Sequence, residues 1–465
     1  MKFRYRKRIR SFPLLRLEIL STDMDDSPER ADGASSSPTI TGDVNTIPYN
    51  PESEYTSKRF LPFHPSFTKR IRFVIDSPLH FLPSSPAQET LYDVSRPSHT
   101  STGLVNTGNS CYLNASLQAL LHSHHILFEY FISGEYANDI CKASPIKGDL
   151  ANIFAELCHG VKTCDPPQSY KPSLLKKILS SFAPQFAGFE QHDAHECILY
   201  IIDGLSEDTN RLQLERLEKI SEDRLELMTP LGRGEYYFQQ QQTFNNSRVS
   251  ALFGGQFRST LTCSKCGFSS DCFDPFYDLS LPIPSSTRSR LTEDRRYIDR
   301  CFGRTRKSSL SIKECLDTLF TDEEELGASE KTLCSKCKMV QRSTKTMQIE
   351  RIPHVLVLHL KRFNHANGKK NNTRVEFPLT GLDLTEFLSV YNGIPPVYDL
   401  TGVVHHRGSM NFGHYKASCF DELLGNWFEF NDERVTRIDA PDELSDCSTP
   451  YVLFYKLQNS KGREY

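Results

Sequence analysis

Apolar residues recur at helical spacing through the first part of the chain that carries a sustained pattern, which begins near residue 101. From Cys111 to Leu121, four leucines are spaced to share one face of a helix. Residues 147–182 hold two further helical patterns, and residues 194–205 hold an apolar stripe with the same period. The charged residues 211–228 also fit a surface helix, whereas we expect a loop at the glutamine run 239–242.

The second half of the chain changes to strand patterns, with alternating apolar positions or short apolar runs between glycines and prolines. These patterns cover residues 255–262, 276–283, 353–363, 398–405, 414–420, 427–431 and 451–457. Residues 368–372 favour a turn. Helices followed by strands, without regular alternation, indicate an α+β domain.

The chain of 465 residues is long enough for one large domain or for two to three ordinary ones. Residues 1–100 are rich in Ser, Pro and charge and show no period, which predicts a disordered basic tail; residues 459–465 form a short second tail. The basic clusters Lys7–Arg10 and Lys69–Arg72 fit nuclear addresses, phosphate-binding patches or ordinary solvated charge. A mitochondrial transit peptide is a further interpretation of the first segment.

The formal net charge of −3 gives no global signal for nucleic-acid binding. The sequence contains no run of about 18 apolar residues, which is the length that a membrane-spanning helix requires. The 14 cysteines accompany no secretory signal, so we expect a reducing compartment in which cysteines serve metal binding, catalysis or the core.

Two C-S-K-C segments predict a structural metal site. Cys263 and Cys266 form one pair, and Cys334 and Cys337 form the second. Two such pairs complete a tetrahedral thiolate site for zinc, although the interval between them is long for a zinc ribbon and fits two separate hairpins. The alternative is two unrelated turns with free thiols. The arginine-rich segment between the pairs, residues 285–309, fits a solvated insertion or a contact with nucleic acid or an acidic partner.

Cys111 is a candidate nucleophile because it would lie in the first turn of its helix. Ser110 is a good N-cap, and free N–H groups and the helix dipole favour an anion such as a thiolate at that position. Asn106, in the preceding turn-rich loop, is placed to direct its amide at an oxygen that becomes negative beside the sulfur. A small buried cysteine in the core is the competing interpretation.

His414 is the candidate base, since it follows a glycine and begins a strand. Asn431 and Asp432 end the next strand pattern, where either side chain would orient the imidazole. His359, His405 and His406 are competitors that spacing alone does not exclude. His192 and Glu196, with no third partner in view, make a poor zinc site.

Several blocks resemble the ubiquitin-specific protease family. GLVNTGNSCYLNASLQALL is similar to its cysteine box, and the segment from Gly413 through YVLFYKL is similar to its histidine box. QHDAHE, DLSLPIP, the two C-x-x-C pairs and LHLKRF resemble the intervening blocks in the same order, so that the resemblance covers residues 101–458. It implies a papain-like cysteine protease fold with a helical thumb, a β palm and zinc-bearing β fingers over roughly residues 250–350.

By this resemblance Cys111 is the nucleophile, His414 the base and Asn431 the orienting residue. Asp432 is a helper and Asn106 supplies the oxyanion hole. Many members carry Asp where this chain has Asn431. The implied reaction is hydrolysis of the isopeptide bond after the C-terminal glycine of ubiquitin on protein substrates, with structural zinc and no catalytic cofactor.

Two alternatives remain. The first is a module that binds ubiquitin but cleaves poorly. The second is a zinc-ribbon nucleic-acid protein, which would not explain the cysteine helix or the Gly–His strand. The CSKCKMV and NGIPPVYDLTGVVHH segments look most like the nucleolar branch of the family. Together with the basic tail, they favour the nucleus or nucleolus over the cytoplasm.

Overall fold

The computed structural model describes residues 102–164, 168–211, 220–284, 309–321, 324–325, 332–364, 368–409, 412–438 and 448–458. These ranges belong to one compact unit, Tyr92–Tyr465. Both predicted tails and residues 285–308 of the arginine-rich segment lie outside the described residues. Within those ranges, no helix combines the length and the apolar character that crossing a membrane requires.

Helices make up most of the first half. They are α1 (Cys111–Leu121), α2 (His125–Ile132), η1 (Glu135–Asp139), α3 (Asp149–Thr163), α4 (Ser173–Phe182), η2 (Pro184–Phe186), α5 (Ala194–Asp208), α6 (Glu222–Leu227), α7 (Pro230–Gln242) and α8 (Arg248–Phe253). Two more follow among the strands, α10 (Ile312–Thr321) and η3 (Thr385–Phe387). The predicted helices at α1, α3, α4 and α5 are therefore confirmed.

The main sheet has eight strands in the order β17-β16-β15-β14-β18-β9-β3, with β13 paired to β14. Its strands are β3 (Leu279–Leu281), β9 (Val355–Leu360), β13 (Leu382–Asp383), β14 (Val397–Gly408), β15 (Gly413–Asp421), β16 (Asn426–Asn431), β17 (Arg434–Ile438) and β18 (Pro450–Leu457). All neighbours are antiparallel except β3 and β9.

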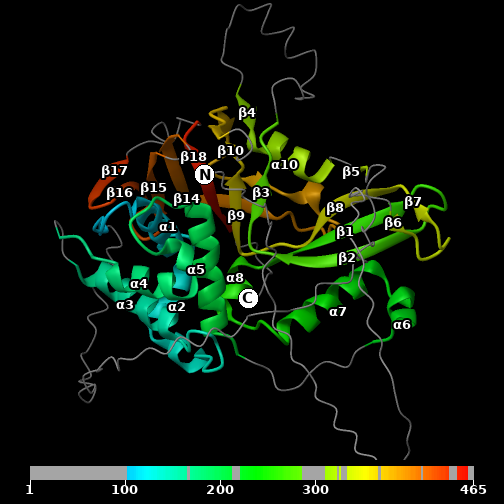
Figure 1. Ribbon diagram of the computed structural model, residues 1–465, viewed down its shortest axis with the longest axis horizontal. Coiled ribbons are helices and arrows are strands. Elements are labelled where there is room, and N and C mark those ends of the chain that lie inside the picture. The colour runs from blue at the N-terminus through cyan, green and yellow to red at the C-terminus, as the bar shows by residue number, and fades with distance from the viewer. Residues whose placement is uncertain are drawn as a thin grey trace, which may run out of the picture. The chain divides into compact units, whose positions relative to one another are not determined.

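A second sheet, in the order β2-β1-β8-β5, extends away from α2, α3 and α4 (Figure 1). It consists of β1 (Gly255–Cys263), β2 (Ser269–Phe276), β5 (Glu324–Glu325) and β8 (Ser343–Arg351). Three small pairings complete the strands: β6 (Thr332–Leu333) with β7 (Val340–Gln341), β10 (Phe363–Asn364) with β11 (Lys369–Lys370), and β4 (Leu310–Ser311) with β12 (Val375–Glu376).

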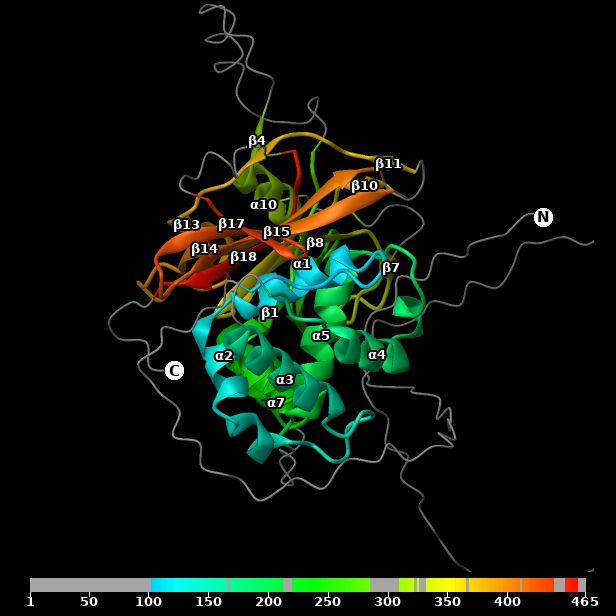
Figure 2. The ribbon, with the colours of Figure 1, turned by 90° about the vertical axis from the view of Figure 1, so that its left-hand side faces the viewer.

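Helix α1 lies between the other helices and the main sheet, where it packs on β15 and α5 (Figure 2). The leucine spacing predicts one buried face, but all its residues are buried because protein surrounds it. Its polar side chains therefore need partners inside the protein. Ser116 donates to Ala194 O (3.2 Å), and Gln118 donates to Thr102 O (2.8 Å).

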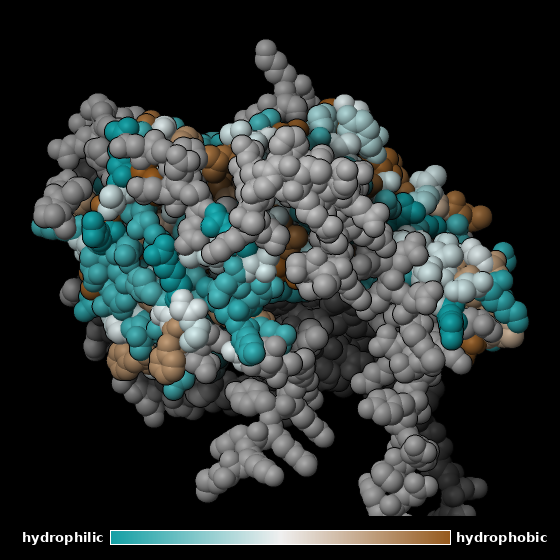
Figure 3. All heavy atoms as spheres, turned by 90° about the horizontal axis from the view of Figure 1, so that it is seen from above, coloured by the Kyte–Doolittle hydropathy of each residue, from teal (hydrophilic) through white to brown (hydrophobic). Residues whose placement is uncertain are grey.

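The main sheet is covered on both faces, which explains why β9 is a continuous apolar run. Val355 and Val357 belong to the core shared with α1–α5 and α8. Leu356 and Leu358 belong to a second core on the opposite face, which includes α10. Where the surface is described and visible from above, hydrophobic residues form small separate groups among hydrophilic ones (Figure 3).

Three local predictions differ from the structure. The glutamine run 239–242 is not a loop but the end of α7, because Thr229 caps that helix and glutamine is a good helix former. Residues 276–283 form no single strand, since Phe276 ends β2 and only Leu279–Leu281 form β3. The turn at residues 368–372 is shorter than expected because Lys369–Lys370 pair with β10.

Candidate active site

Cys111 begins α1 and is only 3% exposed. The loop before it turns through two residues with positive φ, Gly108 (103°) and Asn109 (50°). Glycine is required at position 108, because a Cβ there would also lie 2.8 Å from the ring of Phe189. The loop therefore fixes the backbone immediately before the sulfur.

Ser110 does not cap α1 with its side chain, contrary to the expectation. Its hydroxyl accepts from Thr107 N (2.9 Å) and lies 3.2 Å from Asn106 Oδ1. The serine ties the loop together instead, and the first-turn N–H groups of α1 are left for another acceptor.

His414 lies next to Cys111. A hydrogen bond between the two side chains is the main cause that raises the pKa of His414 to about 9. The hydrogen bond to Asn431 and the charge of Asp432 also raise this pKa, whereas partial burial lowers it. Imidazolium is therefore the favoured form of His414 at neutral pH.

Asn431 contacts the imidazole of His414, with its Oδ1 2.6 Å from His414 Nε2. Pairing of β15 with β16 brings the two residues together, with His414 near the start of one strand and Asn431 at the end of the other. An amide oxygen only accepts, so Nε2 carries the hydrogen and Nδ1 is left to exchange a proton with the thiol.

The three competing histidines have other surroundings. His405 is buried and contacts Thr449 Oγ1 (3.0 Å) and Ser418 Oγ (3.1 Å). His406 packs against aromatic rings, and burial lowers its pKa to about 4. The ring of His359 stacks on His195. The structure brings only His414 of these candidates into contact with Cys111.

Asp432 connects the β16–β17 turn to the loop that precedes Cys111. Its Oδ2 accepts from Asn106 Nδ2 and its Oδ1 accepts from Asn114 Nδ2, both at 2.8 Å. Asn106 Oδ1 accepts in turn from the backbone N–H of Gly108 (3.0 Å). The amide nitrogen of Asn106 is thus engaged by Asp432, and its amide oxygen is engaged by the loop backbone.

Asn114 was missed in the sequence. It lies three residues after Cys111, on the same side of α1, and is buried. Asn114 binds Asp432, which is 318 positions away in the sequence, so only the three-dimensional structure shows that Asn114 lies beside the site.

The four predicted zinc ligands come together at the ends of two hairpins. The sulfurs of Cys263, Cys266, Cys334 and Cys337 all lie within 4.8 Å of one another. Cys266 Sγ and Cys334 Sγ are 3.6 Å apart. Zn–S bonds of about 2.3 Å in a tetrahedron place sulfurs about 3.8 Å apart, so the four thiols fit a zinc ion.

The two cysteine turns have the same backbone geometry. Gly267 N donates to Cys263 O and Lys338 N donates to Cys334 O, both at 2.9 Å. The donor residues both have positive φ, 65° for Gly267 and 52° for Lys338. This repetition supports the interpretation of one site built from two matching halves.

The other candidate metal residues do not form a site. His192 packs on the rings of Tyr112 and Phe186, at centroid distances of 5.2 Å and 5.4 Å. His195, Asp278 and His359 do cluster, but the two imidazoles stack with an interplanar angle of 14°. A nitrogen lone pair lies in its own ring plane, so two nearly parallel stacked rings cannot both direct lone pairs at one ion.

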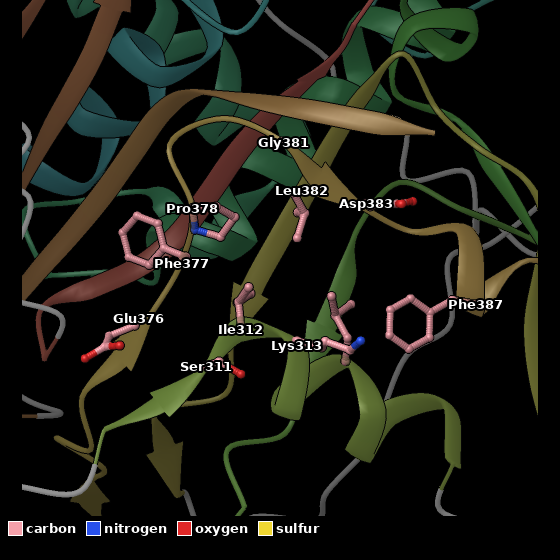
Figure 4. A pocket seen from close by; sticks show the side chains of 11 residues that line it. Ser311, Ile312, Lys313, Glu376, Phe377, Pro378, Gly381, Leu382, Asp383 and Phe387 are labelled. Carbon is pink, nitrogen blue, oxygen red and sulfur yellow. The ribbon is translucent and has the colours of Figure 1, made fainter. Parts of the chain in front are cut away.

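A hollow of about 530 Å³ lies elsewhere, beside α10, β12 and β13 (Figure 4). Its lining consists of Ser311, Ile312, Lys313, Leu316, Glu376, Phe377, Pro378, Gly381, Leu382, Asp383 and Phe387. The lining of this hollow offers neither a thiol nor an imidazole.

Comparisons with known proteins agree with this geometry. A family model described as ubiquitin carboxyl-terminal hydrolase matches residues 102–455. Ubiquitin carboxyl-terminal hydrolase 2 of Rattus norvegicus is 34% identical over 382 residues, which are 82% of this chain and 57% of that protein. The Gallus gallus protein of the same name is 37% identical over 364 residues, covering 78% of this chain and 95% of the relative. The chain thus spans little more than half the length of the rat relative.

A solved structure also resembles this chain in fold. The chain resembles a SAGA DUB module, Ubp8/Sgf11/Sus1/Sgf73 bound to monoubiquitin, with a TM-score of 0.58 and 26% identity. The match covers 78% of this chain and 70% of that one.

Proposed function

The chain belongs to the ubiquitin carboxyl-terminal hydrolase family, and on that premise we propose that it is a deubiquitinating thiol hydrolase. It cleaves the isopeptide bond between the C-terminal glycine of ubiquitin and a lysine of a protein substrate. The observation that carries this proposal is the contact of Cys111 with His414, whose second ring nitrogen is held by Asn431.

The reaction follows from the places of these groups. The resting site is an ion pair, in which the proton of Cys111 has already passed to His414, and the thiolate attacks the glycine carbonyl of ubiquitin. Negative charge develops on the carbonyl oxygen, where the second amide hydrogen of Asn106 stabilises it. The C–N bond breaks as imidazolium protonates the lysine amine, and the glycine carbonyl remains bound to sulfur as a thioester.

Water completes the cycle. His414, now neutral, takes a proton from the attacking water, and the tetrahedral intermediate collapses with release of the Cys111 sulfur. The products are ubiquitin with a free carboxylate and a protein with a restored lysine. Asp432 acts through the two asparagines that it binds, because its hydrogen bonds hold the side chain of Asn106, in the loop before Cys111, in one position.

A ubiquitin dimer joined by an isopeptide bond tests the proposal, with products identified by intact mass. The wild-type chain releases two ubiquitin molecules with free C-terminal carboxylates, and Cys111→Ala releases none. Cys272→Ala, which removes an exposed thiol of the second sheet, serves as the control and retains activity. Absence of cleavage by the wild type, or cleavage that persists in Cys111→Ala, would contradict the proposal.

A ubiquitin-binding module with weak catalysis is the second candidate. It is favoured by one observation, that the partner of His414 is the neutral Asn431 rather than a carboxylate. On this alternative, the wild type binds ubiquitin but turns over no faster than His414→Ala. The raised pKa of His414 supports the hydrolase. It shows that the imidazolium form, which hydrolysis needs to protonate the leaving amine, is favoured although the side chain at position 431 is neutral.

Zinc is proposed as a structural ion held by the four cysteine sulfurs, with no part in the chemistry. The matching turns and the short Cys266–Cys334 distance support this role. Monoubiquitin bound to the solved SAGA module supports ubiquitin as a partner here.

Membership of the nucleolar branch is also proposed, on the CSKCKMV and NGIPPVYDLTGVVHH segments. A nuclear or nucleolar location is proposed on these segments together with the basic clusters Lys7–Arg10 and Lys69–Arg72. Both clusters lie outside the described residues. A fluorescent fusion of the full chain would accumulate in the nucleus and lose this accumulation when both clusters are changed to alanine. Cytoplasmic fluorescence of the unchanged fusion would contradict the proposal.

A further inference from the structure

The segment that precedes His414 is held by a side chain from the helical half of the molecule. Gln191 Nε2 donates to Gly413 O at 2.7 Å, and Gly413 N donates to Gln191 Oε1 at 3.0 Å. The primary amide of glutamine offers one donor group and one acceptor, so it satisfies both backbone polar groups of a single residue. We call this pair of hydrogen bonds the Gln191–Gly413 clamp.

Gly413 is confined on its other side. A Cβ at this position would lie 2.1 Å from His406 Nε2 and 2.8 Å from Arg407 O. Gly413 also pairs with Gly408 as β14 and β15 separate. His406 therefore limits the space around Gly413, and Gln191 binds its backbone groups, so the backbone that leads into His414 has little room to move.

The other end of the clamp is anchored through Asp193. Asp193 Oδ1 accepts from His195 N (2.8 Å) at the start of α5, and its Oδ2 accepts from Tyr451 OH (2.6 Å) in β18. Helix α5 packs against α1, which carries Cys111. The clamp therefore links the helices that hold the sulfur to the strand that holds the imidazole.

We propose that Gln191 is a positioning residue for hydrolysis: by clamping Gly413, it fixes the direction in which the His414 imidazole meets the Cys111 sulfur. The inference rests on the proposed function. Transfer of a proton between sulfur and nitrogen depends steeply on their separation, so a small displacement of the His414 backbone lowers kcat. Gln191 touches the backbone of Gly413 and not the imidazole, so its effect passes through the position of His414.

Three substitutions separate the hydrogen bonds from the bulk of the side chain. Gln191→Ala removes both, and Gln191→Leu removes them with similar bulk. Gln191→Glu keeps the length and, when ionised, has two acceptors and no donor, so that it repels Gly413 O. Gln458→Ala, which removes an exposed glutamine side chain that donates one hydrogen bond to Asp399, is the matched control.

The assay is hydrolysis of a fluorogenic ubiquitin C-terminal amide. We expect kcat to fall about tenfold in the alanine and leucine variants with KM within twofold, and at least as far in Gln191→Glu at pH 7.5. Lower pH protonates the introduced carboxyl and restores a donor, so activity of Gln191→Glu relative to wild type rises as pH falls. Gln458→Ala matches wild type. A kcat within twofold of wild type in Gln191→Ala, or a loss confined to KM, would overturn the assignment.

The position of His414 is also measurable without turnover, which keeps this inference separate from the proposed function. In ¹⁵N-labelled protein, the imidazole signals of His414 report its pKa, which the Cys111 contact raises to about 9. In Gln191→Ala we expect this pKa to move toward its ordinary value because the contact loosens. An unchanged pKa would show that the clamp does not direct the imidazole, whereas a wild type inactive on every ubiquitin substrate would refute the function alone.

Discussion

Asn431 supplies the most informative perturbation of the site, because a neutral amide and not a carboxylate lies against His414 Nε2. The change Asn431→Ala removes the 2.6 Å contact to His414 Nε2 and leaves the hydrogen bond between His414 and Cys111 in place. A hydrogen bond to a charged group contributes about 1.5–3 kcal/mol. Because the hydrogen bond between His414 and Asn431 is exposed to solvent, we expect the lower end, which corresponds to about tenfold in kcat/KM.

His414→Ala is the matched comparison. It removes the base, whose contribution is about 10²–10⁴-fold, and also the cation that stabilises the thiolate. The loss in Asn431→Ala should therefore be smaller than the loss in His414→Ala. Hydrolysis of a fluorogenic ubiquitin C-terminal amide measures both variants over pH 6–10.

The pH profile adds a second test with a defined sign. A raised pKa keeps His414 protonated to higher pH, so the alkaline decline of kcat/KM in wild type should centre near pH 9. Asn431→Ala removes one cause of the raised pKa, so its decline should begin at lower pH. Equal losses in the two variants, or an alkaline decline that Asn431→Ala leaves unmoved, would refute the role given to Asn431.

Three further predictions address the surroundings of the site. Asp432→Ala frees the amide of Asn106, and we expect kcat to fall about 10²-fold with binding of ubiquitin retained; unchanged kcat would contradict the link between the two residues. Cys334→Ser should release zinc, measured by metal analysis, and lower the thermal stability of the second sheet; full zinc content would contradict a four-thiolate site. Asp208→Ala should cost at least about 3 kcal/mol in denaturant unfolding, because Asp208 is buried and its loss leaves Ser144 and three backbone N–H groups without their acceptor. Asp149→Ala, at the exposed start of α3, is the control, and equal small losses would contradict this account.

The sequence predicted the elements whose environment matches a simple pattern. The apolar run before Leu360 predicts a buried strand because both faces of β9 are covered. The turn-rich loop and the leucine spacing predict that a helix begins at Cys111. The leucine pattern did not predict that α1 is buried on every side, since that depends on β15, which is distant in sequence.

The site was only partly predictable for the same reason. Spacing left four histidines as candidates, and the choice required the pairing of β15 with β16, which sets Asn431 beside His414. No local pattern indicates that Gln191 binds Gly413, because the contact joins a loop to the start of β15, 222 residues further along the chain. The prediction of a loop at the glutamine run was wrong, because glutamine is a good helix former and the run ends α7.

The central claim is that Cys111 and His414 act as one catalytic pair on the C-terminus of ubiquitin. Its most direct test is reaction of the full chain with ubiquitin that carries a C-terminal electrophile, followed by peptide mapping of the adduct. We predict a single covalent bond at the sulfur of Cys111, formed at least 10²-fold more slowly in His414→Ala. An adduct on any other cysteine, or a rate that His414→Ala leaves unchanged, would contradict the claim.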